Sequence, residues 1–243
     1  MDRTILLIIA ALLASITEVH AEFTGTTSLA TDYVFRGISN TDEDPAVQGS
    51  LDYSHENGLY AGMWASNVKF RENAGVDAVD TVDEASIEID YYAGFAGESA
   101  SGVGWDVGAI YYSYPGAEAD LNYDYGEACS TLNYSFEAVP LQPEIGVGLY
   151  YSPEYFGDSG KATYTSGTLQ LSLPEEFGIN FTAGKQWFDE ALDYMDWKLG
   201  VTKALAGFDF EIAYTDTDLS KSDCGGESIC AGRAIFSVSR TLK

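Results

Sequence analysis

The sequence is poor in basic residues and has almost no histidine. Its 243 residues include 12 Lys and Arg, 38 Asp and Glu and 2 His, for a formal net charge of −26. Such a charge repels phosphate backbones and attracts cations, which argues against nucleic acid as a partner. His20 lies in the N-terminal segment, so only His55 remains beyond it, beside an expected turn. This leaves no Cys/His metal pattern and no buried base for a catalytic triad.

Motifs of known catalytic chemistry are also missing. The chain contains neither G-x-S-x-G nor H-E-x-x-H. Its acidic pairs fall mostly between the strand-like runs, where carboxylates are solvated rather than tuned for acid–base catalysis. The stretches 42–45 (DEDP) and 216–218 (DTD) lack the turn glycine of an EF-hand. We therefore predict no enzymatic activity, no cofactor and no dedicated metal site, with at most weak binding of divalent cations at these stretches.

Long apolar runs are absent except near the N-terminus. The run from Ile5 to Ala14 is shorter than the ~20 residues of a transmembrane helix, and no later stretch approaches that length. A short polar start precedes it and "EVHA" follows, which is the pattern of a secretory signal peptide cleaved after Ala21. We predict a signal peptide over residues 1–21 and one mature domain over 22–243. The alternative for this run is a buried N-terminal helix.

Cysteine is scarce, with three residues in the whole chain. Cys224 and Cys230 lie six apart around two glycines in "KSDCGGESICAG". In an exported protein this spacing predicts a small disulfide loop, and two free thiols are the alternative. Cys129 is left over and is expected to pack as a small apolar residue.

Aromatic residues are abundant, with 17 Tyr, 12 Phe and 4 Trp, too many for a disordered acidic chain. They fall in runs of alternating polarity, whereas a helical period of 3.6 is nowhere sustained. Most runs have the roughly 9–11 residues of a tilted membrane-crossing β-strand. Twelve strands are predicted, at residues 23–35, 46–55, 59–70, 86–96, 105–114, 125–137, 142–152, 162–172, 178–187, 195–203, 207–215 and 231–242.

The connections between these strands alternate between short and long. Links such as the Asn57-Gly58 turn are tight. The longer links together hold 20 acidic and four basic residues. This alternation is typical of an outer-membrane barrel, with tight periplasmic turns and long external loops. The longer links are residues 36–45, 71–85, 115–124, 153–161, 188–194 and 216–230.

The two faces of the strands favour a bilayer over a protein core as the apolar partner. In "SIEIDYYAGF", Ile87 and Ile89 alternate with Glu88 and Asp90. The polar faces carry small residues, tyrosines and charges of both signs, as a narrow lumen would. We predict an all-β, transmembrane, antiparallel up-and-down β-barrel of about 12 strands. Aromatic residues near the ends of the runs suggest interfacial girdles: Phe23, Phe35, Trp105, Trp187 and Trp197.

Eleven charged residues fall where the alternation points into the predicted lumen. Opposing charges there would form a constriction that selects solutes by charge, or would pair and plug a narrow interior. Arg36 ends the first predicted strand beside "TDED", so its alternative is a salt bridge at the rim. The pore-lining candidates are Asp32, Arg36, Asp52, Lys69, Glu88, Asp90, Asp106, Glu144, Lys198, Asp209 and Glu211.

Specific residues near the N-terminus of the mature chain resemble a known family. They are Tyr33 to Ser39, "PAVQG" at 45–49, "GLY" at 58–60 and "WASN" at 64–67. The sequence is similar there to the TorF porin family of proteobacteria, also called Gcw_chp, and elsewhere in length and strand pattern. The resemblance implies an outer-membrane β-barrel with a channel role. It implies no substrate and no functional residues.

These observations predict a monomeric porin in the outer membrane of a Gram-negative bacterium. We expect a passive, cation-preferring diffusion channel for small cationic or neutral solutes, surrounded by outer-membrane lipid and lipopolysaccharide. Divalent cations would bridge the acidic external loops and lipopolysaccharide phosphates weakly. One alternative is a closed barrel with a structural or surface-interaction role through these loops. Another is an exported, soluble β-sandwich that binds a ligand.

Overall fold

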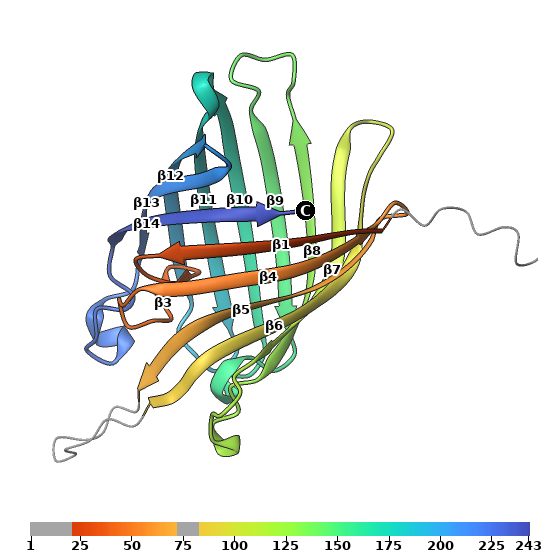
Figure 1. Cartoon of the computed structure of the whole chain (residues 1–243). Coiled ribbons are helices and arrows are strands. Elements are labelled where there is room, and N and C mark those ends of the chain that lie inside the picture. The colour runs from red at the N-terminus through yellow and green to blue at the C-terminus, as the bar shows by residue number, and fades with distance from the viewer. Residues whose placement is uncertain (1–20, 72–82) are drawn as a thin grey trace, which may run out of the picture.

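The computed structural model describes residues 21–71 and 83–243. In this part of the chain, twelve antiparallel strands close into a barrel in which β1 pairs with both β4 and β14 (Figure 1). This closure confirms the predicted up-and-down barrel. The strands are β1 (Ala21–Ala30), β4 (Ala46–His55), β5 (Leu59–Arg71), β6 (Asp83–Glu98), β7 (Val103–Ser113), β8 (Tyr125–Ser135), β9 (Glu144–Ser152), β10 (Ala162–Leu173), β11 (Phe177–Phe188), β12 (Tyr194–Leu205), β13 (Phe208–Thr217) and β14 (Arg233–Leu242).

Two parts of the sequence predictions fall on residues that the structure does not describe. The predicted signal peptide lies outside the described residues except for its last residue, Ala21, which begins β1. Most of the predicted loop 71–85 lies outside them as well.

Apolar side chains cover the outside of the barrel. Leu51, Val107 and Ile212 are 64%, 57% and 65% exposed, respectively. Successive residues of a strand point to opposite faces, so their neighbours Asp52 and Asp106 point inward. An outward apolar band around a polar interior is the pattern of a barrel that crosses a bilayer.

The two ends of the barrel differ in their connections. At one end short turns join the strands, such as residues 56–58 and 206–207. The longer connections emerge at the other end, as the sequence predicts, and the ends are named periplasmic and external accordingly. None of the helices among the described residues is long and apolar enough to cross a membrane. These helices are the 3-10 helices η1 (Ala119–Leu121), η2 (Phe156–Asp158), η3 (Pro174–Glu176) and η4 (Lys221–Cys224).

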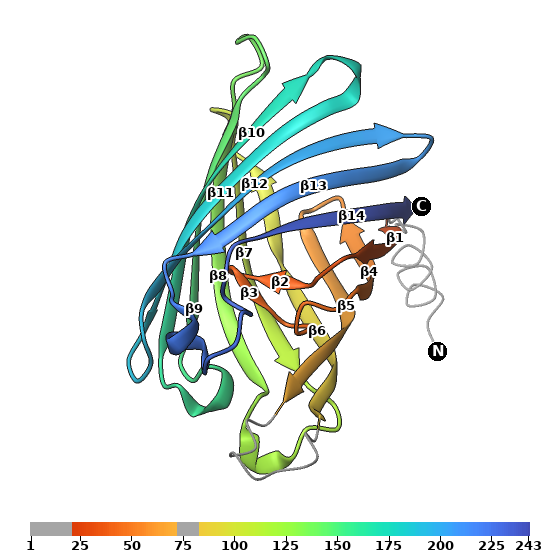
Figure 2. The same ribbon diagram turned by 90° about the vertical axis from the view of Figure 1, so that its left-hand side faces the viewer.

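The first predicted strand, residues 23–35, is wrong at its external end. β1 stops at Ala30, and residues 31–45 turn into the barrel, where β2 (Val34–Phe35) pairs with β3 (Ile38–Ser39) (Figure 2). We call residues 31–45 the inner loop. Residues 36–45 therefore do not form the external loop that the strand pattern predicts. The alternation of polarity continues through the inner loop because its own hairpin is also a pair of strands.

Four of the five predicted girdle aromatics lie on the outer surface. Phe23 and Trp105 are on the periplasmic half, and Trp187 and Trp197 are on the external half, each at least 37% exposed. Phe35 is the exception because it belongs to the inner loop and packs edge-on against Tyr112 inside the barrel.

Candidate functional site

The tip of the inner loop is a two-residue turn that presents one arginine to the lumen. Arg36 and Gly37 both have positive φ, 48° and 81°, as a type I′ hairpin turn requires. Gly37 is also needed for space, because an added Cβ would lie 2.9 Å from the Cβ of Asp196 and would overlap Thr217. The turn thus sits against β12 and β13 with no room for a larger residue.

Arg36 crosses the lumen and pairs with the opposite wall. Its Nη2 lies 2.7 Å from Oε2 of Glu127 on β8, and its Nη1 donates to Oε1 of the same carboxylate at 2.9 Å. Nη1 also donates to Oε1 of Gln186 on β11 at 2.9 Å. The side chains of Arg36 and Glu127 are only 5% and 1% exposed. Two-point pairing of this kind compensates the desolvation of both charges.

Aromatic rings surround the same guanidinium group. The Arg36 Cζ lies 4.7 Å from the ring centroid of Phe35, 5.2 Å from that of Tyr150 and 4.2 Å from that of Tyr164. Ring faces carry negative potential, so these contacts add cation–π attraction to the ion pair. Arg36 therefore lies inside the lumen, and the alternative of a rim salt bridge beside "TDED" does not hold.

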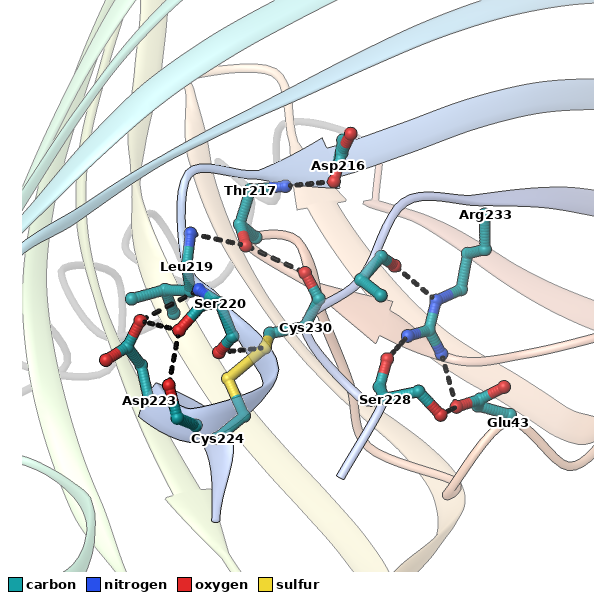
Figure 3. The surroundings of a disulfide bond; sticks show 12 residues. Glu43, Asp216, Thr217, Leu219, Ser220, Asp223, Cys224, Ser228, Cys230 and Arg233 are labelled. Atoms are coloured by element: carbon teal, nitrogen blue, oxygen red, sulfur yellow. Dashed lines mark hydrogen bonds and ion pairs between the residues drawn. A yellow bond between two sulfur atoms is a disulfide. The ribbon is translucent and has the colours of Figure 1, made fainter. Parts of the chain in front are cut away.

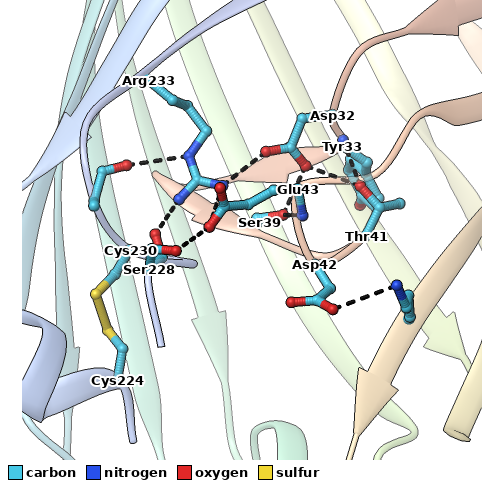
Figure 4. Close-up of polar contacts among 12 residues, drawn as sticks. Asp32, Tyr33, Ser39, Thr41, Asp42, Glu43, Cys224, Ser228, Cys230 and Arg233 are labelled. Carbon is cyan, nitrogen blue, oxygen red and sulfur yellow. Dashed lines mark hydrogen bonds and ion pairs between the residues drawn. A yellow bond between two sulfur atoms is a disulfide. The ribbon is translucent and has the colours of Figure 1, made fainter. Parts of the chain in front are cut away.

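The stem of the inner loop is held by a buried carboxylate (Figure 4). Asp32 accepts hydrogen bonds from the hydroxyls of Ser39 at 2.6 Å and Thr41 at 2.8 Å, and from Nη1 of Arg233 on β14 at 2.8 Å. The Tyr33 hydroxyl donates to Oε1 of Glu88 on β6 at 2.9 Å. Two adjacent residues of the stem are thus tied to different strands of the barrel wall, β14 and β6.

The connection between β13 and β14, residues 218–232, contains the disulfide (Figure 3) and lies against the inner loop; we call it the disulfide loop. Cys224 and Cys230 are bonded, with Cα atoms 6.4 Å apart. The Ser39 N–H donates to the carbonyl of Ile229 at 2.8 Å, which joins β3 to this loop. The Thr217 hydroxyl donates to the carbonyl of Cys230 at 2.8 Å and anchors the loop to β13.

Arg233 links three parts of this assembly. Its guanidinium pairs with Asp32, donates to the carbonyl of Ser228 in the disulfide loop, and lies 3.9 Å from Oε1 of Glu43 (Figure 3). The Ser228 hydroxyl donates to the same carboxylate of Glu43. The inner loop, the disulfide loop and β14 therefore share one polar network.

The start of η4 in the disulfide loop is closed by a capping box. The Asp223 carboxylate accepts hydrogen bonds from the Ser220 hydroxyl at 2.6 Å and from the Ser220 N–H at 2.8 Å. These bonds favour the charged form and lower the pKa of Asp223. The cap orders the segment that leads into Cys224.

The wall behind the inner loop contains buried carboxylates. Glu88 and Asp90 are 1% and 9% exposed and occupy the same face of β6. In the described part of the chain, Oε2 of Glu88, Oδ1 of Asp90 and Oδ1 of Asp196 are buried without a hydrogen-bond partner in the structure. Tyr33 bonds to Glu88 and Gly37 lies beside Asp196, so two of these carboxyl groups belong to the wall against which the inner loop packs.

The lumen on the periplasmic side of the Arg36–Glu127 pair, which we call the periplasmic half of the lumen, is more open and is lined by paired polar groups. The Tyr60 hydroxyl donates to Oδ1 of Asp106 at 3.0 Å. The Lys198 Nζ lies 2.8 Å from Oε2 of Glu211, and Asn180 donates to the other oxygen at 3.0 Å. A cavity of about 260 Å³ lies along β8, β9 and β10 in this half.

The sequence candidates occupy three different places. Asp32 and Arg36 reach the lumen from the inner loop. Lys69, near the external end of β5, forms ion pairs with Asp44 and with Asp42, whose Oδ2 is 3.4 Å from the Lys69 Nζ. Asp209 lies exposed near the periplasmic end of β13. The remaining candidates line the wall: Asp52, Glu88, Asp90, Asp106, Glu144, Lys198 and Glu211.

Several residues of the constriction were not among the sequence candidates. Glu127 and Asp196 share their strand face with other inward residues, so the alternation itself could have found them. Gln186 and Arg233 also alternate with outward neighbours, but the alternation does not reveal their role, which depends on where the inner loop goes. Charge pairing across the lumen is a property of the closed barrel and not of any one strand.

Known structures with a similar fold include two that are described as porins. A structure described as KdgM porin superposes with a TM-score of 0.57 at 5% identity, covering 90% of this chain and 99% of that chain. NanC porin gives 0.54 at 10% identity, covering 90% and 98%. LpxR from Salmonella typhimurium gives 0.51 at 8% identity, covering 90% and 99%. Identities this low show the shared fold alone.

No curated protein matches the sequence. A family model does match, over residues 16–242, and its description is "Bacterial protein of unknown function (Gcw_chp)". This match spans the whole barrel, including the inner loop and the disulfide loop. The chain therefore belongs to the bacterial Gcw_chp family.

Proposed function

We propose that this protein is a passive outer-membrane channel for small cationic or neutral solutes, with the inner loop as its constriction. The observation that carries the proposal is a closed barrel whose polar, charged interior keeps open space on the periplasmic side of the constriction. The periplasmic half retains open space beside Lys198 and Glu211, whose side chains are 40% and 20% exposed. The porin-like neighbours support a channel in general terms.

A preference for cations follows from the charge of the lumen and of its external mouth. Carboxylates outnumber cations among the lumen residues described above, and the whole chain has a net charge of −26. Fixed negative charge along a narrow pore raises the local concentration of cations and repels anions. One of the similar structures is KdgM porin in complex with disordered oligogalacturonate, a polyanion. The negative net charge of this chain favours a cationic or neutral solute over such a polyanion.

A second candidate function is a closed barrel that acts through its acidic external loops. The buried Arg36–Glu127 pair favours it, because the inner loop fills the external half of the lumen. In this case the constriction would be permanent and the barrel would serve as a scaffold for surface interactions. Both candidates share the same fold and the same inner loop.

Single-channel conductance in a planar bilayer under a salt gradient separates the two candidates. For the channel we expect discrete current steps and a reversal potential that favours cations. Protein that is folded, as shown by circular dichroism and by its unheated gel mobility, but carries no current would overturn the channel and leave the closed barrel. A reversal potential that favours anions would contradict the proposed selectivity alone.

Other elements of the proposal concern export and surroundings. We propose that residues 1–21 are a signal peptide and that the barrel is embedded in outer-membrane lipid and lipopolysaccharide. Weak bridging by divalent cations at the external acidic residues, the absence of enzymatic activity and the placement among TorF porins belong to the same proposal. Mass spectrometry of the protein purified from outer membranes tests the first point, because cleavage after Ala21 predicts a mature chain that begins at Glu22.

A further inference from the structure

A cavity of about 460 Å³ lies between the inner loop and the external loops. Nine of its lining residues are aromatic, from Phe35 of the inner loop to Tyr194 at the start of β12. Its volume is within the range of small-molecule sites, roughly 300–1,000 Å³. The cavity is distinct from the Arg36–Glu127 constriction, because neither of these residues lines it.

The aromatic wall of the cavity is a continuous set of packed rings. Tyr123 and Phe156 stack with centroids 4.2 Å apart, and Tyr125 and Tyr155 lie 4.4 Å apart. Phe188 continues the wall with its centroid 5.4 Å from that of Tyr155. Burial raises the pKa of the Tyr155 phenol, so this ring stays neutral and electron-rich. The mutual packing fixes the ring orientations before any ligand arrives.

The remaining wall of the cavity is mixed, with Ile38 and Ile229 beside polar and acidic residues. Glu227 of the disulfide loop and Asp42 of the inner loop contribute carboxylates, and Asn40 contributes an amide. Lys69 also lines the cavity, but it pairs with Asp42 and Asp44 and so adds no net positive charge. A ligand in the cavity would therefore contact aromatic rings and carboxylate-bearing residues in the same site.

We propose that this cavity binds an organic cation, an ammonium group carried on an apolar or aromatic body. Ring faces attract cations, and desolvated ammonium groups gain most from several rings at once. An anion would face both the ring quadrupoles and the carboxylates. In the described residues no group of three or more His, Cys, Asp or Glu side chains is placed to hold a metal ion, which favours an organic cation over an inorganic one.

The barrel already holds one organic cation by the same means. The Arg36 guanidinium lies between three rings and a carboxylate, with its Cζ 4.2 Å from the centroid of Tyr164. Phe35 belongs to both arrangements, since it contacts Arg36 and lines the cavity. The cavity has the same combination of aromatic rings and carboxylates as the surroundings of Arg36. Around Arg36 the cation is a side chain of the protein, whereas the cavity has free volume for a separate cation.

The binding site does not depend on conduction, and it adds a solute class to the proposed channel. A closed barrel with this cavity would still bind the cation. A conducting barrel without it would still pass small ions. The proposed binding site and the proposed channel can therefore be refuted separately, by measuring binding and conductance on the same folded protein.

The test is calorimetric titration of the full barrel in lipid nanodiscs, which keep detergent out of the cavity. The probes are benzyltrimethylammonium and benzenesulfonate, two ions of similar size with one ring each and opposite charge. We expect saturable binding of the ammonium and none of the sulfonate at the same concentrations. Equal binding of both ions, or of neither, would overturn the proposal.

Two variants locate the binding. Phe188→Ala removes one ring of the wall, and we expect about threefold or greater weakening of ammonium binding. Phe181→Ala removes a ring from the same strand on its exposed outer face and serves as the matched control, with unchanged affinity expected. Glu227→Gln, at an exposed loop position, should also weaken binding. Ammonium binding that is unchanged in both Phe188→Ala and Glu227→Gln would contradict the assignment to this cavity.

Discussion

Two ion pairs of nearly equal length mark the two halves of the lumen. Arg36 and Glu127 in the external half are 2.7 Å apart, and Lys198 and Glu211 in the periplasmic half are 2.8 Å apart. Their surroundings differ far more than their geometry. The first pair is at most 5% exposed, whereas the Lys198 side chain is 40% exposed.

The inner loop is the cause of this difference. Both pairs involve strands of the same barrel with the same alternation, but residues 31–45 enter only the external half. Breaking a buried pair by removing one partner costs roughly 3–5 kcal/mol, because a charge is left unpaired in a low dielectric. An exposed pair contributes about 0–1 kcal/mol. Although the two N–O distances are nearly equal, the buried Arg36–Glu127 pair holds the inner loop in place. The exposed Lys198–Glu211 pair leaves its side chains free to change conformation.

Arg36→Ala should give the largest effect on conductance, because it removes the buried ion pair that distinguishes the external half of the lumen from the periplasmic half. Glu127 would be left buried without its partner, so the inner loop loses roughly 3–5 kcal/mol of docking free energy. We expect a severalfold rise in single-channel conductance and faster labelling of Cys129 by a cationic thiosulfonate reagent. Cys129 is the free cysteine and lies two residues to the periplasmic side of Glu127 on β8.

The matched control for this experiment is Arg240→Ala. Arg240 is an outward-facing arginine at the periplasmic end, with its Cζ 5.2 Å from the ring centroid of Phe208. Its loss removes the same side chain without touching the lumen, so conductance and labelling should stay as in the wild type. If Arg36→Ala behaved like this control, the inner loop would not be the element that closes the external half.

Cys224→Ser with Cys230→Ser should give a smaller effect of the same sign. The chain-entropy estimate for so short a disulfide loop is about 2 kcal/mol of local restraint. The carbonyl of Ile229 would then hold the Ser39 N–H less firmly, and the inner loop would open more often. We expect more frequent openings with unchanged step size, and an unchanged melting transition of the barrel. Loss of the barrel fold on reduction would show instead that the disulfide supports the strands.

The barrel wall could be predicted from the sequence because its signal is local. Each strand shows an alternation of polar and apolar residues within its own sequence, and the spacing of the turns gives the number of strands. Twelve strands, with short turns at one end of the barrel and long loops at the other, could therefore be predicted without knowing which strands pair. The same rule failed at residues 31–35. A two-residue turn at Arg36 and Gly37 pairs β2 with β3. Alternation alone does not show whether a segment pairs with a neighbouring strand of the barrel or forms a separate hairpin of this kind.

The constriction could be predicted only in part because its partners are distant in sequence. Arg36 meets Glu127 and Gln186 at separations of 91 and 150 residues. Alternation predicts that Glu127 faces inward but gives no reason to pair it with Arg36. The aromatic cavity was missed for a related reason. Its rings come from strand ends and from the loops between them, where the alternation no longer says which way a side chain points.

The smallest effects are expected in the periplasmic half, where a pair of opposite substitutions sharpens the contrast. Lys198→Gln leaves Glu211 unpaired and the lining more negative, whereas Glu211→Gln leaves Lys198 unpaired and the lining more positive. We expect the reversal potential under a salt gradient to shift toward cations in the first variant and away from them in the second, with stability changed by about 1 kcal/mol or less. The inner loop stays docked in both, so conductance should remain near the wild-type value. Shifts of the same sign in the two variants would mean that this half responds by rearrangement and not by its charge.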